Sequence, residues 1–267
     1  MVFSTLAIVA SLFAAVTVAG EAPASAARTP GEVVRYDFTD GAGTTVADSG
    51  SGAPLDLTVA DPGNVTWVPG GGLTVDASTT IGSPGAASKV TSAIKATNEM
   101  TVEAWVTPAA GEQTGPARLV ASSPNPNARN FMLAQGAYSN LPDDVFASRF
   151  RTTTSFTGTP TMFTPAGTAN PTLTHIVLTR STSDIQTLYV NGVQEASSTI
   201  AGTTANWDNT YPLTLANIAD GSRPWTGTLC LVAVYDSALS ASNVGDNYEA
   251  GCNPTPNVDP VLGAVAN

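Results

Sequence analysis

Residues 100–106, Met-Thr-Val-Glu-Ala-Trp-Val, decide the fold class. The apolar side chains at positions 100, 102, 104 and 106 alternate with the others. Because successive side chains of a strand point to opposite faces, this spacing predicts a strand with one face in a core. Further short strands are expected along the chain between turn residues. They are residues 33–38, 55–59, 65–68, 174–179, 187–190, 213–215 and 226–235.

Turn and helix signals complete this pattern. Asn191-Gly192 directly follows an apolar run and favours a two-residue hairpin. One helix is expected over 239–248, with Ser240 as its N-cap and an end at Gly251. No shift of composition divides residues 32–252, and no strand–helix–strand rhythm is present. These features predict an all-β domain, a two-sheet antiparallel β-sandwich with one short C-terminal helix.

Composition and charge exclude some classes of partner. The chain has 267 residues, 42% of them hydrophobic, and a formal net charge of −11. Proteins that wrap nucleic acid neutralise phosphates with basic residues, so no nucleic-acid partner is expected. An anionic membrane surface is an equally poor partner for the acidic domain.

The N-terminal segment indicates export. Val2–Gly20 carries no charge, and Ala24-Ser25-Ala26 matches the small-residue pattern of a signal-peptidase site. The apolar run is also long enough to cross a bilayer, so a retained membrane anchor is the alternative to a cleaved signal peptide. Either reading places the domain outside the cytoplasm, in the periplasm, at the cell surface or secreted. The expected division is 1–27 signal peptide or anchor, 28–31 linker, 32–252 globular domain and 253–267 extended tail.

The chain has two cysteines, Cys230 and Cys252. An even number of cysteines in an exported chain predicts a disulfide between them, and two free buried thiols are the alternative. The bridge would stabilise the domain by about 3 kcal/mol in the chain-entropy model.

Several strings, in the same order along the chain, resemble the laminin-G-like, concanavalin A-like jelly-roll modules of secreted bacterial proteins. They are Tyr36-Asp37-Phe38 with Asp48-Ser49-Gly50, Thr101–Val106, His175-Ile176-Val177, Leu188–Gly192, Trp225-x-Gly227, and Val232–Tyr235 with Ala238-Leu239-Ser240. The resemblance implies a jelly-roll sandwich and no single activity, since the fold hosts lectins, adhesion domains and glycanases.

The resemblance also raises the question of a structural calcium ion. Many family members hold one near the early Asp-x-Ser-Gly turn, so Asp40 and Asp48 are candidate ligands. The closing strand of this chain has Cys230 and Leu231 where the family usually carries an acidic pair. A structural calcium ion is therefore an open expectation. The alternative is that the disulfide stabilises the closing strand in its place, and no other cofactor is expected.

No catalytic constellation is evident, and the chain is not expected to be an enzyme. Glycanases of this fold need a pair of carboxylates on one strand face, and Glu103 stands alone. His175 is the sole histidine, and no Gly-x-Ser-x-Gly elbow accompanies it. Both residues are expected to be structural.

Two polar and aromatic loops, residues 206–211 and 220–225, are candidates for sugar binding. Trp207 is expected to be an exposed stacking platform, whereas Trp225 fits either a platform or the core. Alternating arginines at 149 and 151 suggest a contact with an anion. Arg223 has the alternative of pairing with Asp220. The predicted binding residues are Trp207, Asp208, Tyr211, Arg223, Trp225, Arg149 and Arg151.

These observations predict a non-catalytic extracytoplasmic binding module for a glycan or polyanion. The alternative is a structural or accessory subunit that docks onto a larger membrane or cell-surface protein complex. An uncleaved N-terminal helix would then join it to partner helices, because Ala7, Ser11, Ala15 and Ala19 share one helix face.

Overall fold

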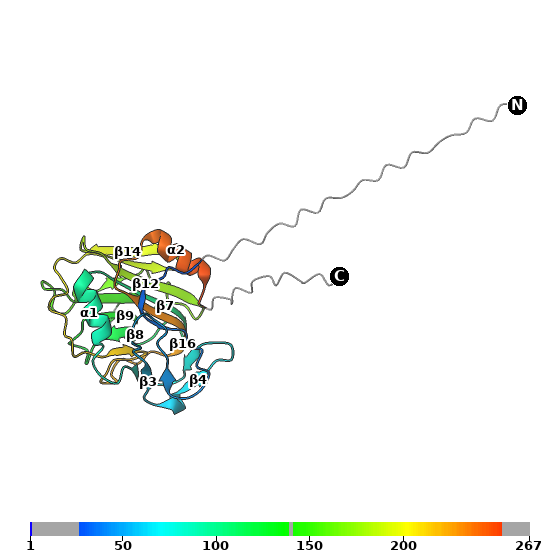
Figure 1. The fold of residues 1–267 in the computed structure, drawn as a ribbon, viewed down its shortest axis with the longest axis horizontal. Helices are drawn as coiled ribbons and strands as arrows, with labels where there is room; N and C mark the ends of the chain where they lie inside the picture. Colours follow the sequence, from blue (N-terminus) through cyan, green and yellow to red (C-terminus); the bar gives the residue numbers. More distant parts are fainter. Residues whose placement is uncertain (2–26, 139–140, 253–267) are drawn as a thin grey trace, which may run out of the picture.

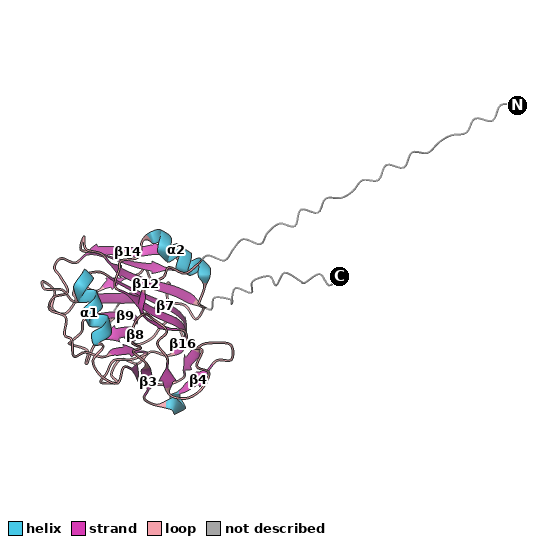
Figure 2. Cartoon of the chain, viewed as in Figure 1, coloured by secondary structure: helices cyan, strands magenta, loops and turns pink. Residues whose placement is uncertain are grey.

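The computed structural model describes residues 1, 27–138 and 141–252. Two antiparallel sheets of eight strands pack face to face (Figures 1 and 2). Sheet A has the order β14 (Val193–Thr199), β13 (Ile185–Val190), β12 (Thr174–Arg180), β7 (Met100–Pro108), β16 (Gly227–Tyr235), β5 (Leu73–Val75) and β4 (Val65–Trp67), with β1 (Glu32–Tyr36) also paired to β16. Sheet B has the order β11 (Met162–Phe163), β10 (Phe146–Phe150), β9 (Phe131–Gln135), β8 (Ala117–Ser122), β15 (Leu213–Leu215), β6 (Ile81–Gly82), β3 (Leu57–Val59) and β2 (Thr45–Val46).

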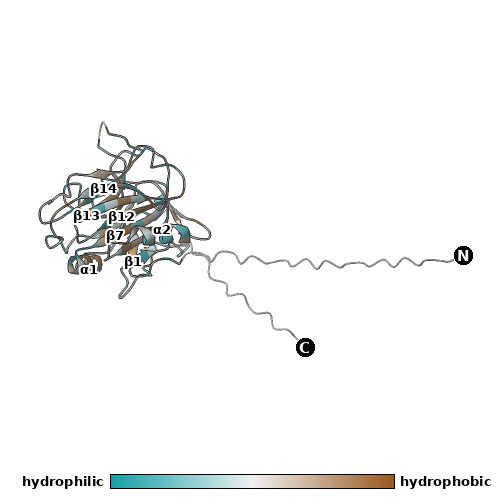
Figure 3. Cartoon of the chain, turned by 90° about the horizontal axis from the view of Figure 1, so that it is seen from above, coloured by the Kyte–Doolittle hydropathy of each residue, from teal (hydrophilic) through white to brown (hydrophobic). Residues whose placement is uncertain are grey.

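The main core lies between the two sheets. Met100, Val102 and Ala104 of β7 point into it and meet side chains of sheet B such as Phe131 and Leu133. This is the face that the alternation in residues 100–106 predicts, and the sandwich is confirmed. In Figure 3 the hydrophobic colouring lies along the strands around β7 and β12, while α2 is largely hydrophilic.

The hairpin between β13 and β14 turns at Asn191-Gly192, as expected. Both residues have positive φ, 51° and 78°, which is the backbone that a type I′ turn requires. The register pairs Val190 with Val193, so the loop has two residues.

The described part of the chain contains two α-helices, of which one was expected. In α2 (Ala241–Ala250) the Ser240 side chain accepts a hydrogen bond from the Asn243 N–H, so the predicted cap is confirmed. The other helix, α1 (Ser88–Thr97), was missed. Its N-cap residue is Ala87, which offers no side-chain acceptor, and its buried side chains are few. A short 3₁₀ turn, η1 (Pro62–Asn64), precedes β4.

Strands β8, β9 and β10 were not predicted as a unit because apolar and polar side chains do not alternate regularly along them. Ala121, Ala134 and Ala147 lie on the outer face of sheet B, where solvent would normally favour polar residues. The segment 217–223, here called the crossing loop, covers them with the side chain of Ile218. Tertiary packing thus makes part of the outer face apolar as well, although Arg118 of β8 and Arg149 of β10 also lie on it.

A disulfide joins Cys230 of β16 to Cys252, directly after α2, and the predicted pairing is confirmed. Within residues 27–138 and 141–252, no helix has the length and apolar content needed to cross a bilayer. The predicted signal peptide or anchor lies almost entirely outside the described residues, and the C-terminal tail lies entirely outside them.

Candidate functional site

Four arginines gather on the outer face of sheet B. Arg118 alternates with core-facing Ala117 and Leu119 of β8, and Arg149 alternates with Phe150 of β10, so both point away from the sandwich. Arg129 precedes β9, and Arg223 ends the crossing loop. We call Arg118, Arg129, Arg149 and Arg223 the arginine cluster.

Three members of the cluster line a pocket of about 440 Å³. Tyr138 lies in its wall, and its ring centroid is 5.2 Å from the guanidinium carbon of Arg149. Asn127 and Thr157 contribute polar groups to the same lining. This arginine pocket therefore combines cations, an aromatic ring and neutral hydrogen-bonding groups, as sites for polar small molecules do.

The buried arginines of the cluster retain donors without acceptors. Arg118 is fully buried and donates from Nη1 to the Pro116 carbonyl at 2.6 Å, but its Nε and Nη2 have no partner among the described residues. Arg129 donates to the carbonyls of Thr157 and Pro126 and leaves its buried Nε unpaired. Unpaired buried donors cost free energy, so the cluster is stabilised if an acceptor binds there.

The cluster also lacks a counter-charge. In the described part of the chain, the ion pairs involve none of these four arginines. Burial, together with repulsion from Arg129 and Arg223, lowers the pKa of Arg118 to about 10, although Tyr138 opposes the effect. Burial and repulsion from Arg149 and Arg223 likewise lower the pKa of Arg129. Because a group with a pKa near 10 is still protonated at neutral pH, Arg118 keeps its charge in a chain whose net charge is −11.

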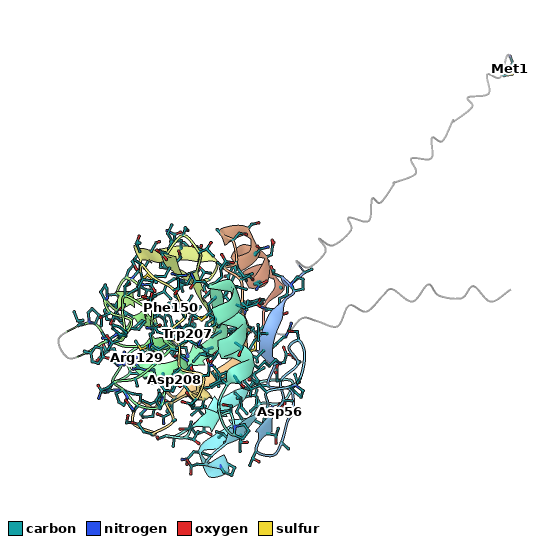
Figure 4. The ribbon with its side chains drawn as sticks, turned by 60° about the vertical axis from the view of Figure 1, so that its left-hand side comes forward. Met1, Asp56, Arg129, Phe150, Trp207 and Asp208 are labelled. Carbon is teal, nitrogen blue, oxygen red and sulfur yellow. A yellow bond between two sulfur atoms is a disulfide. The ribbon has the colours of Figure 1, made fainter. Side chains whose placement is uncertain are left out.

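The structure corrects the expectation that Trp207 is an exposed platform. Its side chain is only 3% exposed and stacks on Phe131 with ring centroids 5.7 Å apart. Its Nε1 donates to the Arg151 carbonyl at 2.7 Å, and its ring centroid lies 5.1 Å from that of Phe150 (Figure 4). Trp225 is fully buried and donates to Gln135 Oε1, which places it in the core rather than on a platform.

The remaining predicted residues separate into two groups. Arg149 and Arg223 meet in the arginine pocket, whereas Arg151, Asp208 and Tyr211 do not line it. Asp208 closes a turn by accepting from the Thr210 N–H and hydroxyl, and these hydrogen bonds lower its pKa. Arg223 makes no ion pair with Asp220, whose carboxylate instead accepts from Ser222.

Arg118, Arg129 and Tyr138 were missed by sequence reasoning. One signal was available, an arginine inside the otherwise apolar run Ala117-Arg118-Leu119-Val120-Ala121. A charge in such a run is expected to be paired or functional, because arginine is almost never fully buried without a partner.

Asp48 is held by four donors. Its buried carboxylate accepts from the backbone N–H groups of Arg35, Gly50 and Leu55 and from Lys89 Nζ at 2.6 Å. Burial alone would raise the pKa of Asp48, but these hydrogen bonds outweigh it and lower the pKa.

Asp40 and Asp48, the candidate calcium ligands, each accept hydrogen bonds from the protein. Asp40 makes only long contacts with the Ala47 N–H. No cluster of three or more potential metal ligands occurs within residues 27–138 and 141–252. Because the Lys89 ammonium already lies against Asp48, the donor set does not favour a calcium ion between Asp40 and Asp48.

Glu103 forms the centre of a buried network on the outer face of sheet A. It accepts from His175 Nε2 at 2.9 Å, from the Tyr235 hydroxyl at 3.1 Å, from Asn247 Nδ2 at 2.7 Å and from Arg28. Burial alone would raise its pKa, but His175 and Arg28 lower it to about 2. Glu103 and His175 are both fully buried, and a structural role for both stays a prediction.

Three solved structures resemble the chain in fold. A Trypanosoma rangeli sialidase in complex with 2,3-difluorosialic acid matches with a TM-score of 0.59 and 18% identity over 82% of this chain and 33% of the sialidase. The ligand binding domain of botulinum neurotoxin serotype D, in complex with N-acetylneuraminic acid, matches with a TM-score of 0.54 and 10% identity over 82% of this chain and 51% of that chain. Domain 4 of an extracellular arabinanase from Geobacillus stearothermophilus, in complex with arabinotriose, matches with a TM-score of 0.51 and 17% identity over 82% of this chain and 98% of that domain.

At these identities the likeness shows the fold alone, and the chain spans only about a third of the sialidase. No match was found among curated proteins. The sequence profile of one family matches residues 81–245, more than half of the chain, and the matched region contains the whole arginine cluster. The chain therefore belongs to the concanavalin A-like lectin/glucanases superfamily.

Proposed function

We propose that the chain is a non-catalytic, extracytoplasmic binding module that recognises anionic glycans through the arginine pocket. One observation carries the proposal. Arginines that are buried or partly buried line a pocket and have no carboxylate partner among the described residues. Buried charges are normally paired, so the bound anion would supply the missing partner.

The accessible ends of two arginines support this role. Arg149 donates from Nε to Thr161 Oγ1 at 2.6 Å, which orients its guanidinium, and its terminal nitrogens make no hydrogen bond to a described residue. Arg223 is half-buried in the same lining. A guanidinium fork fits a carboxylate or sulfate with two parallel hydrogen bonds, and Tyr138 offers a ring against which a sugar can pack.

The comparisons support the class of ligand. Two of the structural neighbours are complexes with sialic acids and a third is a complex with a neutral oligosaccharide. The disulfide is consistent with a location outside the cytoplasm, since such bonds persist in oxidising compartments.

A glycan array that contains neutral and acidic oligosaccharides tests the proposal on the purified protein. We expect acidic glycans to give stronger binding signals than neutral ones. Arg149→Gln and Arg223→Gln should each weaken binding by about tenfold or more, because each loses a charge-assisted hydrogen bond. Arg35→Gln, which removes the same charge on sheet A, is the matched control and should bind normally.

Two results would count against the proposal. One is an array on which no acidic glycan binds above its neutral counterpart. The other is acidic-glycan binding that both pocket variants retain. Either result would favour the alternative of a subunit that docks on another protein.

A further inference from the structure

The outer face of sheet B has a second hollow, on the other side of the crossing loop. Its volume is about 430 Å³, and its lining includes Thr58, Thr80, Ser83 and Thr214. The charged side chain in this lining is Asp220, and no lysine or arginine contributes to it. We call this hollow the threonine pocket.

The two pockets lie along one sheet face. Arg149 lies on β10 and Thr214 on β15, and the strand order between them is β10, β9, β8 and β15. Three strand spacings of roughly 4.8 Å place these positions about 14 Å apart. A ligand of a few linked sugars can therefore span from one pocket to the other.

The crossing loop gives the two pockets opposite charge. It contributes Arg223 to the arginine pocket and Asp220 to the threonine pocket. Asp220 is fixed in its place because its carboxylate accepts from the Ser222 N–H at 3.0 Å and from the Ser222 hydroxyl at 2.7 Å. Asn217 Oδ1 accepts from the N–H groups of Ile218 and Arg223, so the loop is braced internally.

This charge difference acts on any ligand that crosses the loop. At physiological ionic strength the Debye length is about 8 Å, so the positive field of Arg149, about 14 Å away, is largely screened at the threonine pocket. A second anionic group there would meet Asp220 without a cation, on a chain whose net charge is already −11. A neutral sugar would instead offer hydroxyl donors to the Asp220 carboxylate, which accepts hydrogen bonds.

We infer that the preferred ligand has one isolated acidic sugar, which occupies the arginine pocket, joined to neutral sugars that extend over the threonine pocket. A continuous polyanion is disfavoured. The inference rests on the proposed function and adds the order of charges along the ligand. Asp220 is then a specificity-determining residue. It repels a second negative charge of the ligand in the threonine pocket and does not affect the acidic sugar in the arginine pocket.

Isothermal titration with glycans of similar length tests the inference. The singly acidic probes are sialyllactose and glucuronosyl-xylotriose, the polyanion is tetragalacturonate, and the neutral probes are lactose and xylotetraose. We expect at least one singly acidic probe to bind about tenfold or more tightly than tetragalacturonate. This ratio of affinities should persist at low salt, where electrostatic attraction increases the affinity of a polyanion most.

Two matched variants sharpen the test. Asp220→Asn keeps the acceptor oxygen for Ser222 and removes the charge, so it should tighten tetragalacturonate binding several-fold and leave the singly acidic probes within about twofold. Asp246→Asn, at an exposed position of α2, removes an equal charge from the opposite sheet and should change neither. Thermal unfolding of both variants checks that the fold is retained.

The outcomes separate the two proposals. If tetragalacturonate binds as tightly as the singly acidic probes, and Arg149→Gln weakens both, the arginine pocket stands as an anion site and the charge order is wrong. An unchanged preference in Asp220→Asn also overturns the role of Asp220. If no acidic probe binds more tightly than the neutral ones, the proposed function and this inference both fail.

Discussion

Replacing Glu103 with glutamine tests the buried network that joins Arg28 and α2 to strands β7, β12 and β16 of sheet A. The pKa of Glu103 is about 2 in the folded protein, against an ordinary value of 4.5. A tenfold change in an acid dissociation constant corresponds to about 1.4 kcal/mol, so the ionised form stabilises the fold by about 3 kcal/mol. Removal of one partner of a buried ion pair costs a similar amount, about 3–5 kcal/mol.

The sign of the pH dependence follows from the direction of the change. Because the folded pKa lies below the unfolded value, the stabilisation is fully present above about pH 4.5 and is lost as the pH falls toward 2. We therefore expect Glu103→Gln to lower the free energy of unfolding by about 3 kcal/mol at pH 7. The difference from the unmodified protein should become small near pH 2.

Urea unfolding of the two proteins at pH 7, 4 and 2 measures this difference directly. The matched control is Glu32→Gln, whose partly exposed carboxylate pairs with Arg35 at 3.3 Å and should cost less than about 1 kcal/mol. The reasoning is refuted if Glu103→Gln costs no more than this control at pH 7. It is also refuted if the difference is the same at pH 2 as at pH 7.

Three further predictions concern stability. Reduction of the Cys230–Cys252 bridge, which spans 22 residues, should cost about 3 kcal/mol, and an unchanged urea midpoint in dithiothreitol would contradict this. Trp207→Ala should cost about 3–5 kcal/mol in thermal or urea unfolding, since the indole fills the core; a neutral effect would show that it is a surface residue after all. Lys89→Met should raise the pKa of Asp48 in an NMR titration and destabilise the protein at neutral pH, whereas an unmoved pKa would mean that the backbone donors alone hold the carboxylate ionised.

Several features of the fold could be predicted from the sequence because they depend on neighbouring residues. The apolar alternation of residues 100–106 identifies a half-buried strand, and the same positions do face the core. Asn191-Gly192 specifies its own turn, and Ser240 caps its own helix. Each of these signals depends on residues that are close together in the sequence.

Features that depend on packing were misread. The exposure of Trp207 could not be judged from its loop, because β9 and β10 supply the rings that cover it. Strands β8 to β10 lost their alternation because the crossing loop buries their outer face. Helix α1 lacks a side-chain cap, so its local signal was weak.

The candidate site divides in the same way. Local sequence patterns were sufficient to predict the sandwich and the disulfide, and to identify Arg149 and Arg223 as unusual cations in an acidic chain. The packing of the chain brings Arg129 into one pocket with them, places Arg118 beside it, and puts Asp220 on the other side of the loop. The physical reason is that strand pairing and loop packing bring together residues distant in the chain, and the potential at a site is the sum over groups that no local pattern records.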